Sequence, residues 1–116
     1  MTPGDRMRRV NTAVRQVVGD AVAQDLKDPR VGFVTVTDVK TSPDFRHARV
    51  YVSVLGEPAE QEATLEGLRS AHGFLQSRVA GELHLKHTPE LDFILDDTAE
   101  RAFRLEALMD EQEGGE

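Results

Sequence analysis

The 116 residues are enough for one domain with a modest core, and the absence of cysteine excludes disulfide bonds, thiolate zinc sites and thiol catalysis. No apolar run approaches the roughly 18 residues of a membrane span, and the N-terminal residues lack the pattern of a secretory signal, so we expect a cytoplasmic protein. The net charge of −7 is uneven, because residues 90–116 hold ten acids against two arginines and leave residues 1–89 at +1. This asymmetry neither proves nor excludes a nucleic-acid partner.

A first helix is predicted over residues 5–26, with Asp5 as its N-cap. On the face opposite its apolar stripe, Arg8 and Arg15 are two turns apart, so both guanidinium groups can follow one strip of backbone phosphates. Two further arginines flank this strip. Basic residues opposite an apolar face are as often simply solvated charge, and that alternative stays open. The apolar stripe consists of Val10, Ala13, Val14, Val17, Val18, Ala21 and Val22.

Two strands are predicted to follow and to form an antiparallel hairpin. Pro29 ends the helix, and residues 33–40 are rich in β-branched side chains, although their apolar positions do not share one parity. A turn cluster at residues 41–44 leads into a second strand. This second strand alternates cleanly, with four apolar residues facing one way and polar ones facing the other. The apolar four are Ala48, Val50, Val52 and Val54.

A pair of helices with a kink between them is predicted next. Apolar residues keep helical spacing from Leu65 to Leu83, but Gly73 interrupts the run, where glycine costs roughly 1 kcal/mol relative to alanine. We expect Gly73 to supply unusual backbone angles and Ala71 to supply a small side chain at a tight corner. A second helix from about Phe74 would then offer free N–H groups to a phosphate. The alternative, favoured by spacing alone, is a plain helical hairpin whose glycine only allows close packing.

The last elements are a third strand, a helix and a tail. Residues 91–95 form the strand, which could join the sheet parallel to the first strand after the two-helix crossover. Residues 97–100 resemble a capping box and open a helix that runs to about Met109. We therefore expect an α+β fold with helices on one face of a three-stranded sheet, one domain over residues 1–109, and a disordered acidic tail over residues 110–116.

Catalytic patterns are scarce. Neither a phosphate-binding glycine loop nor a nucleophile elbow is present. His84 and His87 lack further ligands at zinc spacing, and Asp96 with Asp97 fits a capping role better than a magnesium site. We expect no enzyme, no metal and no cofactor.

Nucleic-acid binding fits the basic residues better. Aromatic residues for base stacking are few, with Tyr51 and Phe33 as the candidates, which favours recognition of the shape and backbone of folded RNA. The residues that we expect to contact RNA are Arg8, Arg15, Lys27, Arg30, Lys40, Arg46, Arg49, Ala71, Gly73, Arg78 and Lys86.

Several sequence blocks follow one another between about residue 6 and residue 109, and their number and fixed order are more specific than any single short motif. The blocks are DPRV at 28–31, VTVTDV at 34–39, SPDFRHARVYVSV at 42–54, AHGFL at 71–75 and PELDF at 89–93, followed by Asp96 and Asp97. In this order they resemble the signature of the bacterial ribosome-binding factor A family.

The resemblance implies a type II KH-like fold, in which an Ala-x-Gly kink (here Ala71 to Gly73) replaces the Gly-x-x-Gly loop of ordinary KH domains. It also implies a non-enzymatic assembly factor that binds the free small ribosomal subunit, assists late maturation of its rRNA, including the 5′ end, and supports growth in the cold. Some members carry a longer charged C-terminal extension, and its role is not carried over to this chain. We expect a monomer without a membrane or small-molecule partner.

A second hypothesis stays open beside this one. A KH-like module could use its acidic C-terminal surface to contact a ribosomal protein or another factor, with RNA incidental. A third, a small hydrolase using Asp96 and Asp97, would require metal-dependent turnover.

Overall fold

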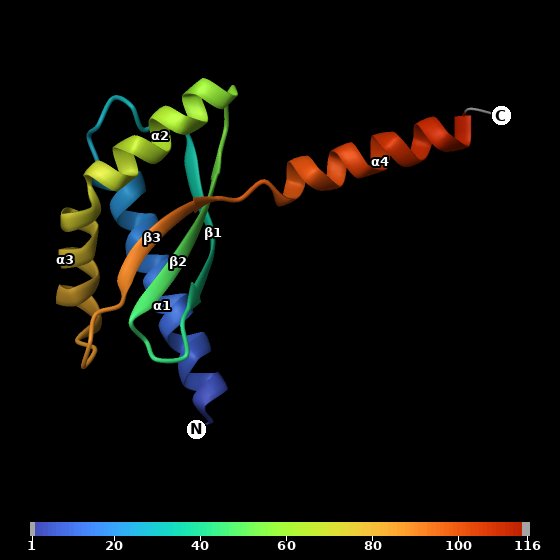
Figure 1. Cartoon of the computed structure of the whole chain (residues 1–116). Coiled ribbons are helices and arrows are strands. Elements are labelled where there is room, and N and C mark those ends of the chain that lie inside the picture. The colour runs from blue at the N-terminus through green and yellow to red at the C-terminus, as the bar shows by residue number, and fades with distance from the viewer. Residues whose placement is uncertain (1, 115–116) are drawn as a thin grey trace.

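A computed structural model describes residues 2–114, with the backbone alone at residues 3, 99 and 111–114. It confirms the α+β fold and the predicted order of elements (Figure 1). None of the described helices has the length and apolar character needed to cross a membrane. In chain order the elements are α1 (Pro3–Gln24), β1 (Val34–Thr41), β2 (His47–Val54), α2 (Pro58–Ser70), α3 (His72–Leu83), β3 (Glu90–Leu95) and α4 (Thr98–Gly114).

The sheet has the order β1-β2-β3, so β2 lies in the centre. β1 and β2 pair antiparallel, as predicted for a hairpin. The third strand pairs with β2 and is parallel to it, from His47↔Glu90 to Val52↔Leu95, so the expectation that it runs parallel to the first strand was wrong. The reason is that the α2–α3 crossover returns the chain beside the strand it left, which is the usual way to form a parallel pair.

A β-bulge explains why the first strand had no single parity. The register with β2 shifts between Val36 and Asp38, so one residue of β1 has no direct partner. Val36 and Val39 are therefore both buried although they are three residues apart. The bulge residue Thr37 uses its hydroxyl group to bond Tyr51 O at 3.3 Å and Asp96 Oδ2 at 2.6 Å.

Helices α1, α2 and α3 cover one face of the sheet and leave the other open (Figure 1). The clean alternation predicted for β2 is confirmed, since its four apolar residues are buried and His47, Arg49 and Ser53 are exposed. Each fully buried aliphatic side chain contributes roughly 1.5–3 kcal/mol to folding. The core therefore fixes which face of β2 is presented to solvent. The predicted stripe of α1 joins this core through Val10, Val14, Val17, Val18, Ala21 and Val22.

Helix α1 begins earlier than predicted. Thr2, not Asp5, is the N-cap, because the Thr2 hydroxyl accepts a hydrogen bond from Asp5 N at 3.2 Å and a proline occupies the first turn. The helix ends at Gln24, slightly before the predicted boundary.

The kink between α2 and α3 is confirmed, but its position is Ala71. This residue has φ −87° and ψ 8° and separates the two helices. The prediction that Gly73 supplies the unusual angles was wrong, since Gly73 lies within the first turn of α3 and only Gly56, among the described glycines, has a positive φ. A Cβ added at Gly73 would meet no atom within 4 Å. Packing therefore does not require a glycine at this position.

Helix α4 projects away from the sheet (Figure 1). It continues to Gly114, so residues 110–114 are helical where a disordered tail was predicted, and residues 115–116 lie outside the described part of the chain. Asp96 connects the start of α4 to the sheet, because its carboxylate accepts hydrogen bonds from Thr98 N at 3.0 Å and from the Thr37 hydroxyl group of β1. Glu100 accepts a hydrogen bond from Gln61 Nε2 at 3.2 Å, which joins α4 to α2.

Candidate nucleic-acid interface

Basic side chains gather at one end of the molecule, where the start of α1, the β1–β2 turn and the loop before β3 meet. The Arg6 guanidinium lies 5.3 Å from the centroid of the Phe45 ring in the turn, and Asn11 Oδ1 accepts from Thr41 N at 2.9 Å. Glu90 N donates to Arg46 O at 2.8 Å, which places the loop before β3 beside the turn. We call this group the hairpin-end cluster; it comprises Arg6, Arg8, Arg9, Lys40, Arg46, Arg49 and Lys86.

The cations of this cluster make few contacts with acids. Arg8 pairs with Asp5 one turn earlier, but its side chain remains 77% exposed. The pKa of Asp5 is lowered, first by the hydrogen bond with Thr2 and then by the one with Arg8. Exposed ion pairs contribute only about 0–1 kcal/mol, so this pair leaves Arg8 accessible to another anion. Among the described side chains, the other cations of the cluster have no carboxylate within 4 Å.

The open face of the sheet carries both signs of charge. Lys40 and Arg49 are cross-strand partners on β1 and β2, and Lys40 Nζ lies 5.4 Å from the centroid of the Tyr51 ring. On the other side of β2, Arg49 is the register partner of Asp92. Because acids line the β3 side, the positive surface extends from Lys40 and Arg49 toward the turn and not across the whole sheet.

Lys27 and Arg30 lie in a different place, in the connection from α1 to β1. Arg30 Nη2 bonds Asp28 Oδ2 at 2.6 Å, and this hydrogen bond lowers the pKa of Asp28 to about 2. Thr64 Oγ1 donates to Arg30 O at 3.2 Å and accepts from Gly32 N at 3.3 Å. Arg30 therefore helps to fasten this loop to α2.

The kink residues and Arg78 lie near that second group. Ala71 is half-buried, whereas Gly73 is exposed and leaves the first turn of α3 open. Arg78 is already engaged, because its guanidinium pairs with Asp25 and lies 5.4 Å from the centroid of the Phe74 ring. The Asp25 contact links α3 to the end of α1. The structure thus divides the predicted RNA-contacting residues, except Arg15, between two ends of the molecule.

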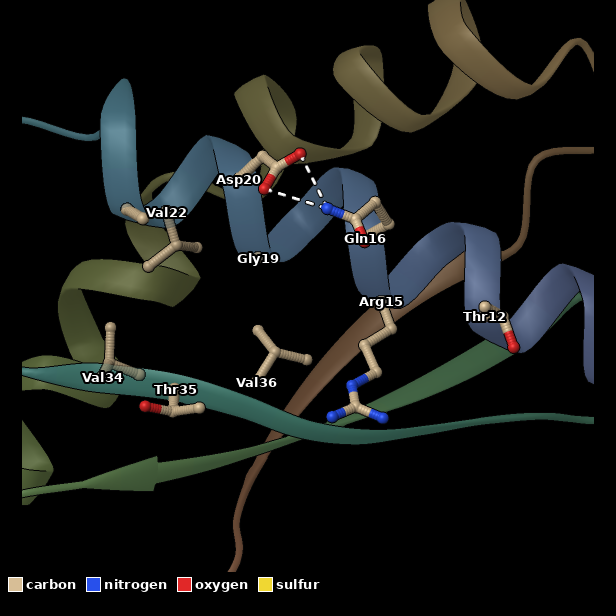
Figure 2. Close-up of a pocket in the computed structure, with 10 residues that line it drawn as sticks. Thr12, Arg15, Gln16, Gly19, Asp20, Val22, Val34, Thr35 and Val36 are labelled. Atoms are coloured by element: carbon tan, nitrogen blue, oxygen red, sulfur yellow. Dashed lines mark hydrogen bonds between the residues drawn. The ribbon is translucent and has the colours of Figure 1, made fainter.

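Arg15 belongs to neither end. Two turns along α1 from Arg8, it reaches across a groove toward β1, as Figure 2 shows. The predicted strip of Arg8 and Arg15 therefore lies on one helix face, with its two guanidinium groups in different surroundings.

Arg6 and Arg9 were not among the RNA-contacting residues expected from the sequence. Their pattern on the helix was visible, but their proximity to the β1–β2 turn depends on how α1 packs against the sheet. No local signal in the sequence reports that packing. The contact between Arg6 and Phe45 is the clearest example, because these residues are far apart in the chain.

The carboxylates considered for a metal have structural partners. Asp96 accepts from Thr37 and Thr98, and the Thr37 hydrogen bond is the main cause that lowers the pKa of Asp96 to about 2. Asp97 pairs with Arg101 at 3.0 Å. Within the described side chains, no group of three or more potential ligands is placed to hold a metal ion.

Comparison with known proteins gives one consistent family. The family described as Ribosome-binding factor A matches residues 6–109. A Ribosome-binding factor A from Anaeromyxobacter sp. (strain Fw109-5) is 47% identical over 112 residues, which cover 96% of this chain and 92% of the relative.

Solved structures agree. A Thermotoga maritima protein determined by NMR superposes with a TM-score of 0.70 at 38% identity, covering 81% of this chain and 90% of its own. The crystal structure of ribosome-binding factor A from Thermus thermophilus gives 0.68 at 26% identity, covering 77% and 94%. A Thermus thermophilus ribosome-binding factor A homology model, fitted into a cryo-EM map of a complex with the 30S subunit, gives 0.63 at 27%, covering 74% and 90%. Because the family model matches nearly the whole of this chain, the chain belongs to the ribosome-binding factor A family.

Proposed function

We propose that this protein binds the free small ribosomal subunit and holds a conformation of its rRNA during late maturation, without catalysing a reaction. The hairpin-end cluster carries the proposal, because it gathers cations from three separate segments and leaves most of them without a carboxylate partner among the described side chains. Lys and Arg side chains in this state are suited to rRNA phosphates. The relative fitted into the map of a 30S complex supports the same partner.

The proposal extends to the biology of the subunit. In the cytoplasm, the protein as a monomer would assist processing of the 5′ end of the rRNA and support growth in the cold. The Ala71–Gly73 kink provides a second contact, since the exposed Gly73 leaves room for an RNA backbone at the start of α3. Lys27, Arg30 and Arg78 contribute less, because Arg30 and Arg78 are held by acids of the protein itself.

Binding to purified free small subunits tests the central claim. The double variant Arg46→Glu/Arg49→Glu should reduce co-sedimentation at low salt by roughly tenfold or more, because repulsion replaces attraction at two phosphates. The slope of log K against log salt should also fall by about 0.7–0.9 for each phosphate that is no longer neutralised.

The matched control is Arg69→Glu/Arg104→Glu. It changes the net charge equally, at exposed positions on α2 and α4 away from the hairpin-end cluster. Equal loss of binding in both double variants would overturn the proposed surface, because the loss would then not depend on the hairpin-end cluster.

One observation favours a second candidate, in which the C-terminal helix contacts a protein. Helix α4 exposes Phe103 at 74%, Leu105 at 60%, Leu108 at 57% and Met109 at 53%, beside acidic residues. The variant Phe103→Ser/Leu108→Ser separates the two candidates. If it abolishes binding to the subunit while Arg46→Glu/Arg49→Glu leaves binding intact, the protein-contact candidate replaces the RNA candidate.

A further inference from the structure

The two edge strands of the sheet, β3 and β1, differ in how their outward-facing backbone groups are hydrogen-bonded. At the β3 edge, side chains of α3 occupy the backbone groups: Gln76 Nε2 donates to Pro89 O at 2.7 Å, and Gln76 Oε1 accepts from Leu91 N at 3.1 Å. His72 Nε2 lies 3.1 Å from Leu91 O, so it also covers this edge. Such cover prevents another strand from pairing with the first residues of β3.

The β1 edge lacks this cover at its first residues. Leu55 N donates to Phe33 O at 3.0 Å, which sets the alternation of the antiparallel ladder. By that alternation, the N–H and C=O groups of Val34 and Val36 point away from β2. Among the described residues, the only hydrogen bond from a side chain of α1 to the backbone of β1 is the one between Asn11 and Thr41, at the far end of the strand.

A groove lies beside this free edge. Its volume is about 430 Å³, within the range of roughly 300–1,000 Å³ typical of ligand sites. Its apolar lining comes from Val22, Val34 and Val36, between α1 and β1 (Figure 2). Gly19 lines the groove without a side chain, and a Cβ at this position would meet no atom within 4 Å. A larger side chain at this position would therefore extend into the groove without displacing its neighbours.

Two charged residues, Arg15 and Asp20, line the groove, and they point in different directions. Arg15 extends toward β1, and no carboxylate lies within 4 Å of it among the described side chains (Figure 2). Asp20, the acid at the rim, turns away from the strand and accepts two hydrogen bonds from Gln16 at 3.1 Å. An occupant that reaches Arg15 therefore needs an acidic group.

We propose that this groove binds a short extended segment of another protein, which pairs its backbone with Val34 and Val36 and places an Asp or Glu side chain against Arg15. Strand addition of this kind obtains affinity from main-chain hydrogen bonds and specificity from alternate side chains. The bulge after Val36 limits the pairing to a short stretch. A second copy of β1 fits less well, since it brings its own Arg15 and offers that residue no carboxylate. RNA has no strand backbone to pair with the edge.

A peptide selection tests the proposal. A displayed library of random decapeptides is selected on the full chain, and each selected peptide is then measured against Gly19→Leu and Gly81→Leu. Gly81 is the matched control, because it also lies in a helix and its added Cβ would also meet no atom within 4 Å. We expect acidic peptides whose affinity falls at least tenfold with Gly19→Leu and stays unchanged with Gly81→Leu.

Three further measurements identify the binding mode. The backbone amides of Val34 and Val36 should exchange more slowly with solvent when a selected peptide is bound. Val34→Pro removes one outward N–H at the start of an edge strand, where proline is tolerated, and should weaken the peptide without filling the groove. This variant also keeps the test valid if Gly19→Leu fails to fold. Arg15→Gln should remove the preference for acidic peptides.

Three outcomes would overturn the proposal. One is a selection that yields no peptide sensitive to Gly19→Leu or Val34→Pro. Another is a concentration-dependent dimer, seen by light scattering, that Gly19→Leu abolishes, which would assign the groove to a second copy. The last is binding of a single-stranded RNA oligonucleotide that Gly19→Leu weakens while no peptide binds, which would assign the groove to RNA.

Discussion

The two ends of the molecule carry basic residues that serve different purposes. At the hairpin end, Arg46 and Arg49 are exposed, and among the described side chains no carboxylate lies within 4 Å of either guanidinium group. The other end, which we call the kink end, holds the α1–β1 connection and the kink between α2 and α3. There Arg30 pairs with Asp28 and Arg78 pairs with Asp25, and these pairs hold a loop and a helix in place. The same residue type is thus available for a partner at one end and committed to the fold at the other. A count of basic residues does not distinguish these two states.

The largest expected effect is a loss of stability when a side chain is added at Gly67, in the contact between α2 and the α1–β1 connection at the kink end. A Cβ at Gly67 would lie 2.7 Å from Val31 Cγ2, closer than side chains pack. Gly67→Val should therefore lower the free energy of unfolding by about 1–3 kcal/mol, measured by urea denaturation. Gly81→Val is the control, because the space around Gly81 is open. If the two variants are equally stable, the contact between this loop and α2 does not hold the kink end together.

A smaller effect is expected from the ion pair that links α1 and α3. A double-mutant cycle with Arg78→Gln and Asp25→Asn should give a coupling energy of up to about 1 kcal/mol, since both side chains are partly exposed. The same cycle at the hairpin end, with Arg8→Gln and Asp5→Asn, should give less, because that pair joins neighbours on one helix and Arg8 is 77% exposed. A larger coupling at Arg8 would reverse the comparison between the two ends.

The smallest expected effect concerns acid stability at the kink end. Arg30 lowers the pKa of Asp28 from 3.8 to about 2 in the folded protein. The ionised Asp28 therefore stabilises the fold above about pH 4, and this contribution is lost as the pH falls from about 4 to about 2. Asp28→Asn should flatten the pH dependence of the free energy of unfolding over this interval. Asp92→Asn, an exposed acid on the open sheet face, is the control, and an identical flattening there would contradict the role of Arg30.

Much of the fold follows from local patterns in the sequence. The alternation of Ala48, Val50, Val52 and Val54 predicted both the strand and its buried face, because side-chain direction in a strand has period two. The valine stripe of α1 predicted its packed face for the corresponding reason of helical period. The kink between Ala71 and Gly73 was also predicted, although its unusual backbone angles were assigned to Gly73 and the break between the helices lies at Ala71. Local propensity marks a weak point in a helix, but the packing of both helices on the sheet decides which residue breaks it.

The candidate site was only partly predictable. The identity of the basic residues and the elements that carry them could be predicted, since both depend on neighbours in the chain. The pairing of β3 with β2, the position of Arg6 over Phe45 and the engagement of Arg78 by Asp25 became visible only in the folded molecule. These outcomes depend on contacts between residues far apart in the chain, whose free energies are set by the packed core and not by local pattern. For that reason the availability of a cation for a partner is a property of the folded molecule.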